Sequence, residues 1–294
     1  MFTNEEQMKK ICATLFGLAA LSACGTTYQV TEVSDTHASQ AKAIFAQEQN
    51  TATAQAGQRL SSSQAVRQFE QVVSRVEPVA ERFCREQTAD RKDFDCNIVV
   101  KVDSKKDYRN AFQTYDENRR PLVIFTLPMI ADARNPDELA FVMGHEMGHH
   151  LAAHIEKQQQ QALAGALILG VAAAYAGSSP YVDPVIARQN VDTAVQLGAE
   201  IGNLAFSQTY ELESDVIATY ITKAAGYDPV KGARFFARPE NPKHSNGQLS
   251  FWGTHPADEK RIATVLATAE RMKQTGASAP QKAERKETPL YSQE

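Results

Sequence analysis

The chain has 294 residues, of which 43% are hydrophobic and 22% are charged, and its formal net charge is −4. This composition is typical of a globular protein with one or two domains. It excludes collagen-like and low-complexity chains, and four cysteines are too few for a disulfide scaffold. The basic residues form no stripe, so nucleic acid is not an expected partner. No apolar run reaches the roughly 18 residues that a membrane-spanning helix needs.

Residues 1–23 are predicted to be a lipoprotein signal peptide. A basic start precedes an apolar run over 11–21, and small residues follow it. The residues that end at Cys24 resemble a bacterial lipobox, which implies that Cys24 carries a lipid and becomes the first residue of the mature protein. Translation starts at either Met1 or Met8, because the acidic residues between them are unusual in such a leader. A buried N-terminal helix is the alternative interpretation.

Removal of the signal peptide leaves two cysteines besides Cys24, namely Cys84 and Cys96. The bacterial periplasm is oxidising, so these two are predicted to form a disulfide. Two free buried thiols are the alternative. The interval between them is too long for a redox CxxC motif and gives no metal-binding pattern.

Residues 24–60 are rich in Thr, Gln and Ala and lack sustained apolar periodicity, which predicts a tether. A folded domain is expected over 61–275, followed by a disordered tail over 276–294. Within the domain, the predicted helices cover residues 62–87, 136–157, a region around 204–226 and 257–273, and the predicted strands cover 96–102 and 122–127. This pattern predicts an α+β fold that is predominantly helical with a small β-sheet.

Two segments of the domain are less regular. Residues 162–177 are apolar and rich in Ala and Gly, but they are too few to cross a membrane as a helix. A core helix is the first interpretation of this segment, and a flexible flap or a surface that touches lipid are the alternatives. Residues 238–256 contain several prolines and polar residues and are predicted to be a mobile loop.

The most specific signal in the sequence is an HExxH motif inside the helix predicted over 136–157. On a helix, residues i and i+4 share a face, so the imidazoles of His145 and His149 can bind one zinc ion. Glu146 lies about 100° further around the axis, where it can act as general base on a water whose pKa zinc lowers to about 7. Gly144 and Gly148 each cost about 1 kcal/mol of helix stability, which indicates that another element approaches closely. A helix with two incidental histidines is the alternative.

A catalytic zinc ion needs a third protein ligand and an open fourth position. The metzincin pattern is excluded, because Ala152 and Ile155 occupy its glycine and last histidine positions. Glu211, on a later helix, is the candidate third ligand, and Asp215, one turn on, can accept a hydrogen bond from a ligating histidine. Glu213 points elsewhere and is the weaker candidate. The same spacing also fits a solvated acidic face.

An HExxH motif followed on a later helix by ExxxD resembles the HtpX, BepA and LoiP group of zinc metallopeptidases of the bacterial envelope, whose metal sites are of the gluzincin type. The resemblance covers roughly residues 62–272. Further segments that resemble this family are residues 110–112, 135–154, 205–208 and 254–256. One departure is Ser214, where relatives usually have alanine, and little change is expected from it.

The resemblance implies a zincin-like metalloprotease fold with one zinc ion per chain. It implies that His145, His149 and Glu211 bind the ion and that Glu146 is the general base and acid. It also implies a role for His255, which either hydrogen-bonds the oxyanion formed during cleavage or binds the zinc ion and blocks its open position. A plain surface histidine is the alternative at that position.

The implied function is a zinc metalloendopeptidase that cleaves unfolded or misassembled envelope proteins. The lipid on Cys24 is expected to anchor the chain, and because the next residue is Gly25 and not Asp, the expected location is the periplasmic face of the outer membrane, as in enteric-type bacteria. An extended peptide is expected to add alongside the strand at 122–127 through main-chain hydrogen bonds. The alternative, suggested by His255, is a zinc-containing chaperone or assembly factor for outer-membrane proteins with latent proteolysis, which implies contact with the outer-membrane assembly machinery.

Overall fold

The computed structural model describes residues 26–52, 60–177, 183–202, 208–238 and 251–284. They form two compact units, of which one contains Thr26–Ala152 together with the chain from Gln208 onward, and the other contains Ala153–Ser207. The predicted signal peptide, Cys24 and the end of the predicted tail lie outside the described residues. So does most of the loop predicted over 238–256.

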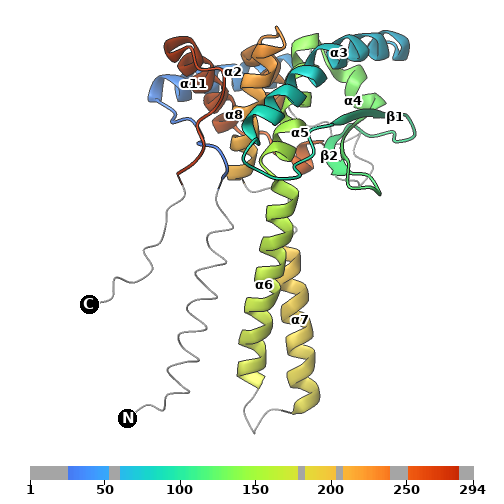
Figure 1. The fold of residues 1–294 in the computed structure, drawn as a ribbon, viewed down its shortest axis with the longest axis vertical. Coiled ribbons are helices and arrows are strands. Elements are labelled where there is room, and N and C mark those ends of the chain that lie inside the picture. Colours follow the sequence, from blue (N-terminus) through green and yellow to red (C-terminus); the bar gives the residue numbers. More distant parts are fainter. Residues whose placement is uncertain (1–25, 53–59, 178–182, 203–207, 239–250, 285–294) are drawn as a thin grey trace. The chain divides into compact units, whose positions relative to one another are not determined.

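The larger unit is mainly helical, with one small sheet (Figure 1). Its α-helices are α2 (Asp35–Ala52), α3 (Ser62–Gln87), α4 (Leu127–Asp132), α5 (Pro136–Leu151), α8 (Gln208–Ala224), α9 (Pro229–Ala233), α10 (Phe251–Thr254) and α11 (Glu259–Thr275), and a 3₁₀ helix, η1, covers Arg234–Ala237. The smaller unit contains α6 (His154–Gly177) and α7 (Pro184–Gly202). These elements confirm the predicted fold class.

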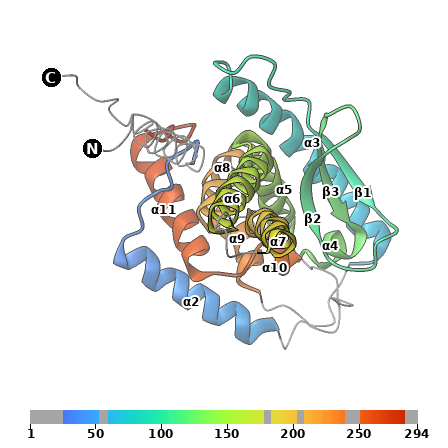
Figure 2. The same ribbon diagram turned by 90° about the horizontal axis from the view of Figure 1, so that it is seen from below.

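The sheet has three strands, β1 (Val99–Asp103), β2 (Ala111–Tyr115) and β3 (Pro121–Thr126), in the order β1-β3-β2. Figure 2 shows β3 between the other two strands. It pairs parallel with β1 and antiparallel with β2. Periodicity predicted β1 and β3, whereas only the resemblance at residues 110–112 pointed to β2.

Helix α5 runs through the centre of this unit, and its residues from Glu138 to Leu151 are all buried. It begins where the sequence predicts, because the Asn135 side chain accepts a hydrogen bond from the Glu138 backbone N–H and Pro136 occupies the first turn. It ends earlier than predicted, since Ala153 has a φ of +56° and breaks the helical path before α6.

Part of the segment expected to be a tether is folded. Helix α2 packs against α11, and Ala41 on α2 is fully buried. Ile44 and Phe45 are partly buried against the same core, so three apolar positions at spacings of three and one give α2 a narrow apolar stripe. Such a short stripe in a Gln- and Ala-rich sequence is a weak signal, and its burial is decided by the presence of α11.

A disulfide joins Cys84 on α3 to Cys96, which precedes β1. Their Cα atoms lie 5.7 Å apart, and both residues are buried. The bond ties the longest helix of this unit to the edge of the sheet.

Replacing both of these cysteines by alanine should lower the free energy of unfolding. A cross-link that closes so short a loop contributes about 3 kcal/mol, because it restricts the unfolded chain. Urea unfolding of Cys84→Ala/Cys96→Ala should therefore give a lower midpoint than the oxidised parent chain. The reduced parent chain is the matched control and should unfold close to the double variant. Equal midpoints for the oxidised and reduced parent would contradict the prediction.

The smaller unit is a helical hairpin in which α6 packs along α7 (Figure 1). The segment predicted over 162–177 forms most of α6, and its larger apolar side chains are exposed. The core interpretation of this segment is therefore wrong within the described chain. In the part of the chain that the structure describes, we find no helix with the length and hydropathy needed to cross a bilayer.

Candidate metal centre

Two glycines on α5 allow α8 to pack unusually close to it. A Cβ atom on Gly148 would lie 3.1 Å from the carbonyl oxygen of Ser214 and 3.2 Å from its Cα. A Cβ atom on Gly144 would lie 3.3 Å from the Cα of Ala218. Any larger residue would push the two helices apart. This confirms that the glycines of the HExxH motif mark the close approach of a second element, which is α8.

This packing brings a buried carboxylate to the two histidines of α5. The Nε2 atoms of His145 and His149 lie 3.0 Å apart. Glu211, in the first turn of α8, places Oε2 3.3 Å from Nε2 of His145 and Oε1 3.4 Å from Nε2 of His149. Its side chain is 2% exposed, which excludes the alternative of a solvated acidic face.

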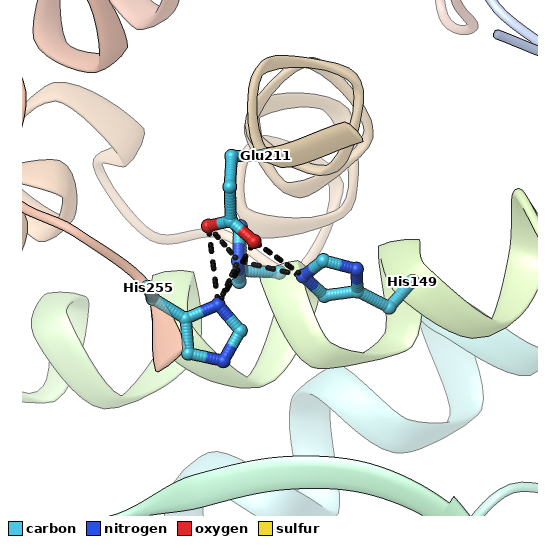
Figure 3. Close-up of side chains that lie close together, drawn as sticks. His149, Glu211 and His255 are labelled. Carbon is cyan, nitrogen blue, oxygen red and sulfur yellow. Dashed lines mark hydrogen bonds and ion pairs between the residues drawn. The ribbon is translucent and has the colours of Figure 1, made fainter. Parts of the chain in front are cut away.

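A fourth buried side chain, His255, joins this cluster from the residue that follows α10. Its Nδ1 lies 3.1 Å from each carboxylate oxygen of Glu211 and 3.3 Å from Nε2 of His145. Figure 3 shows the Glu211 carboxylate pointing between the rings of His149 and His255. The alternative of a plain surface histidine at position 255 is wrong, because this side chain is 1% exposed.

The spacing of these four donor atoms fits one zinc ion. They all lie within 4.8 Å of one another. A tetrahedral zinc ion with bonds of about 2.0–2.1 Å separates its ligand atoms by about 3.3–3.4 Å. The separations that join His145 to His149, Glu211 to both of these histidines, and His255 to Glu211 and His145 are 3.0–3.4 Å, close to that value. Imidazole and carboxylate are ligands that zinc prefers. The cluster could therefore hold one metal ion.

A second layer of side chains fixes the orientation of the first. Oδ1 of Asp215 lies 2.9 Å from Nδ1 of His145, as the sequence predicts. Arg261, at the start of α11, donates from Nε and Nη2 to the two oxygens of Asp215 at 2.8 and 2.7 Å. Its Nη1 lies 3.0 Å from Oε2 of Glu211. Arg261 was missed in the sequence, since a single arginine on a helix has no distinctive spacing, and only its place soon after His255 could have drawn attention to it.

The charges of this cluster keep both carboxylates ionised. Burial by itself would raise the pKa of Glu211, but the neighbouring His255 and Arg261 outweigh it and hold that pKa well below its ordinary value. Burial would likewise raise the pKa of Asp215, and Arg261 outweighs it, so that pKa is also lowered. An ionised Glu211 is the form that binds a cation.

The family model for Peptidase family M48 matches residues 67–269. This chain belongs to that family. Its members are zinc-dependent peptidases, which agrees with the donor set described above. The matched residues run from α3 to α11 and include every residue of the cluster.

Three curated relatives match shorter parts of the chain. The beta-barrel assembly-enhancing protease of Escherichia coli K12 is 27% identical over 175 residues, covering 56% of this chain and 33% of the relative. The metalloprotease LoiP of the same strain is 30% identical over 136 residues, covering 46% of this chain and 51% of the relative. The mitochondrial metalloendopeptidase OMA1 of Schizosaccharomyces pombe is 28% identical over 144 residues, covering 47% and 37%. The chain thus spans a third to a half of these relatives.

In this member of the family, Glu146 lies beside the cluster without belonging to it. Its Oε2 accepts a hydrogen bond of 3.1 Å from the backbone N–H of Gln113, and its Oε1 lies 3.4 Å from Nε2 of His255. Burial raises the pKa of Glu146. A buried carboxyl group whose pKa is raised can both accept and return a proton, which suits a general base and acid.

The edge of the sheet that faces Glu146 is β2 and not β3. Because the N–H of Gln113 points to Glu146, this side of β2 is not paired with β3. Strand β3, which covers most of residues 122–127, is paired on both sides and has no free edge for a peptide. The expectation that substrate adds alongside 122–127 is therefore wrong, and the available edge is the one at 111–115.

Glu213 lies outside the metal cluster, as the sequence predicts, but it has a structural partner. Its Oε1 accepts hydrogen bonds from the backbone N–H groups of Thr27 and Tyr28, at 2.6 and 2.7 Å. Tyr28 is fully buried and forms a β-bridge with Lys282. The start of the described chain is therefore attached to α8, two residues from Glu211.

Proposed function

We propose that this chain is a zinc metalloendopeptidase in which His145, His149 and Glu211 bind the ion and Glu146 is the general base. The observation that carries the proposal is the set of buried donor atoms that lie within 4.8 Å of one another, beside a carboxyl group that is not part of the set. When bound, the metal would polarise the scissile carbonyl and lower the pKa of the attacking water.

The residues of the chain supply the remaining steps. An extended peptide would pair with the edge of β2 that faces Glu146, and it would replace Glu146 as the partner of the Gln113 backbone N–H. Glu146 would take a proton from the attacking water and then deliver it to the leaving nitrogen. Recognition through main-chain groups reads the backbone more than the side chains, and it requires an extended substrate. This favours unfolded or misassembled proteins as substrates.

We further propose that the protein acts in the bacterial envelope, anchored by a lipid on Cys24 at the periplasmic face of the outer membrane. The lipobox-like residues before Cys24 support this location, and the Cys84–Cys96 disulfide fits an oxidising compartment. The name of one relative, the beta-barrel assembly-enhancing protease, suggests substrates or partners among outer-membrane proteins and their assembly machinery.

The experiment that tests the enzyme assignment is a metal analysis combined with a cleavage assay on unfolded casein. The purified full chain should contain about one zinc ion. Its cleavage of casein should stop when a chelator removes the metal and return when zinc is added. A chain that contains no zinc, or that cleaves casein equally well in the presence of the chelator, would overturn the proposal.

The position of His255 favours a second candidate function, in which the protein is an assembly factor with latent proteolysis. If His255 supplied the fourth ligand to a bound zinc ion, no open position would be left for a substrate carbonyl or for water. The segment that carries His255 is also attached to the sheet, because the backbone N–H of Phe251 donates to the carbonyl of Arg109, just before β2.

Replacing His255 by alanine should therefore raise the cleavage of unfolded casein by about tenfold, because the variant no longer spends most of its time in a blocked state. Initial rates at equal zinc content would measure this. His37→Ala, which alters a histidine of α2 that contacts Glu270 and is not one of the clustered donors, is the matched control and should leave the rate unchanged. Loss of cleavage in His255→Ala would instead support the oxyanion role.

A further inference from the structure

The hairpin of α6 and α7 has its small residues between the helices. Ala162 and Ala166 are buried in α6, and Gly170 continues their spacing of four residues. A Cβ atom on Gly170 would lie 2.8 Å from Cγ2 of Val195 on α7. On the α6 side, the contact with α7 is thus lined by small residues, as is common where helices pack in lipid.

The large apolar side chains of α6 point away from that seam. On α6 they recur at spacings of four residues, and Leu163, Val171 and Tyr175 are 63%, 68% and 84% exposed. Among the described residues, Val102 is the only exposed large apolar side chain outside the hairpin. In a hairpin that packs in water the large residues would lie between the helices and the small ones outside. The arrangement on α6 is the reverse, and its exposed apolar face needs an apolar surface to cover it.

The charges of the hairpin fit the surface of a bilayer. No charged residue occurs from 158 to 182, which includes the apolar face of α6. Arg188 and Asp192 are exposed on α7. Charged side chains cost about 2.5–3.5 kcal/mol each at the bilayer centre, so a depth near the headgroups is favoured. A helical element with one apolar and one charged side is typical of segments that lie in the membrane interface.

The hairpin also starts next to the residues that would follow the lipid anchor. Thr27 donates from Oγ1 to the carbonyl of Ala152, and α6 begins two residues later at His154. Thr27 is three residues from Cys24, so their Cα atoms are at most about 11 Å apart along an extended chain. A lipid on Cys24 would therefore hold the first residue of the hairpin close to the membrane surface.

We propose that the hairpin of α6 and α7 binds the lipid bilayer through its apolar face, which comprises Leu163, Leu167, Ile168, Val171 and Tyr175. This face forms a second membrane contact in addition to the lipid on Cys24. The claim that there are two contacts rests on the anchor proposed above. The partner is the headgroup and upper acyl region of a phospholipid layer.

Fluorescence quenching by brominated lipids tests this contact on the full chain reconstituted into vesicles of phosphatidylethanolamine and phosphatidylglycerol. Trp252→Phe removes the single native tryptophan. In that background, the tryptophan of Val171→Trp should emit at shorter wavelength when the chain is bound to vesicles. Its fluorescence should lose intensity when the acyl chains are brominated. Glu70→Trp, at an exposed position on α3, is the matched control and should show neither change.

The lipid on Cys24 is read separately, by mass spectrometry of the N-terminal peptide from the same samples. Unquenched Val171→Trp in a chain that carries the lipid would overturn the hairpin inference and leave the anchor in place. Quenched Val171→Trp in a chain without the lipid would overturn the anchor and support the hairpin contact. If Val171→Trp is unquenched but its emission shifts with protein concentration, a second copy covers this face, and the lipid contact is wrong.

Discussion

Replacing Glu146 by glutamine should lower the rate of peptide-bond cleavage by about 10²- to 10⁴-fold, the range typical of losing a general base. Glutamine has nearly the same shape and can still lie near the N–H of Gln113, but it cannot take a proton from water. Zinc should remain bound, since Glu146 is not one of the clustered donors. The variant thus separates chemistry from metal binding.

The comparison should be made on casein at equal zinc content, with the metal measured in each sample. Glu70→Gln, an exposed substitution of the same kind on α3, is the control and should behave as the parent chain. Turnover that is unchanged in Glu146→Gln would exclude Glu146 as the general base, because glutamine cannot take a proton from the attacking water.

Replacing Glu211 by glutamine should lower zinc affinity by more than the 10- to 100-fold that is typical of changes outside the ligand shell. The amide is neutral and binds zinc poorly, so the ion would be held by histidines without a charged ligand. Arg261 would also lose one of its two buried carboxylate partners. Casein cleavage should fall in proportion to the zinc that is lost.

The chain offers a close control for this experiment in Glu213, which is buried on the same helix but binds the backbone of Thr27 and Tyr28. Glu213→Gln should keep its zinc and its activity, since Glu213 is not one of the clustered donors. Competition with a chromophoric chelator would give both affinities. Retention of zinc in Glu211→Gln together with its loss in Glu213→Gln would reverse the assignment of the third ligand.

The local elements of the site follow from short-range rules that the sequence contains in full. The cap formed by Asn135 and the fixed φ of Pro136 start α5, and the helical repeat then places His145 and His149 on one face. Gly144 and Gly148 indicate a neighbouring helix because their cost to α5 has no local compensation. These features predict a metal-binding helix without reference to the rest of the chain.

The tertiary structure decided what lies around that helix. Arg261 and His255 reach the cluster from a part of the chain more than a hundred residues away, and no periodicity connects them to α5. The pairing order of the sheet likewise made β2, and not β3, the edge that faces Glu146. Strand order depends on which partners are present in the fold, and alternation along a single strand does not contain it.

The apolar segment at 162–177 shows the same division. The sequence of this segment determined that it is helical and apolar. A run of Ala, Gly, Leu and Val is nevertheless compatible both with a buried core helix and with an exposed surface. Only the packing of α6 on α7 through Ala166 and Gly170 turned the large side chains outward.

The sequence by itself thus determined the zinc-binding helix and its chemistry, because both depend on neighbours within one turn. The three-dimensional fold decided the fourth donor, the substrate edge and the exposed face, because each depends on segments that meet only after the chain has folded.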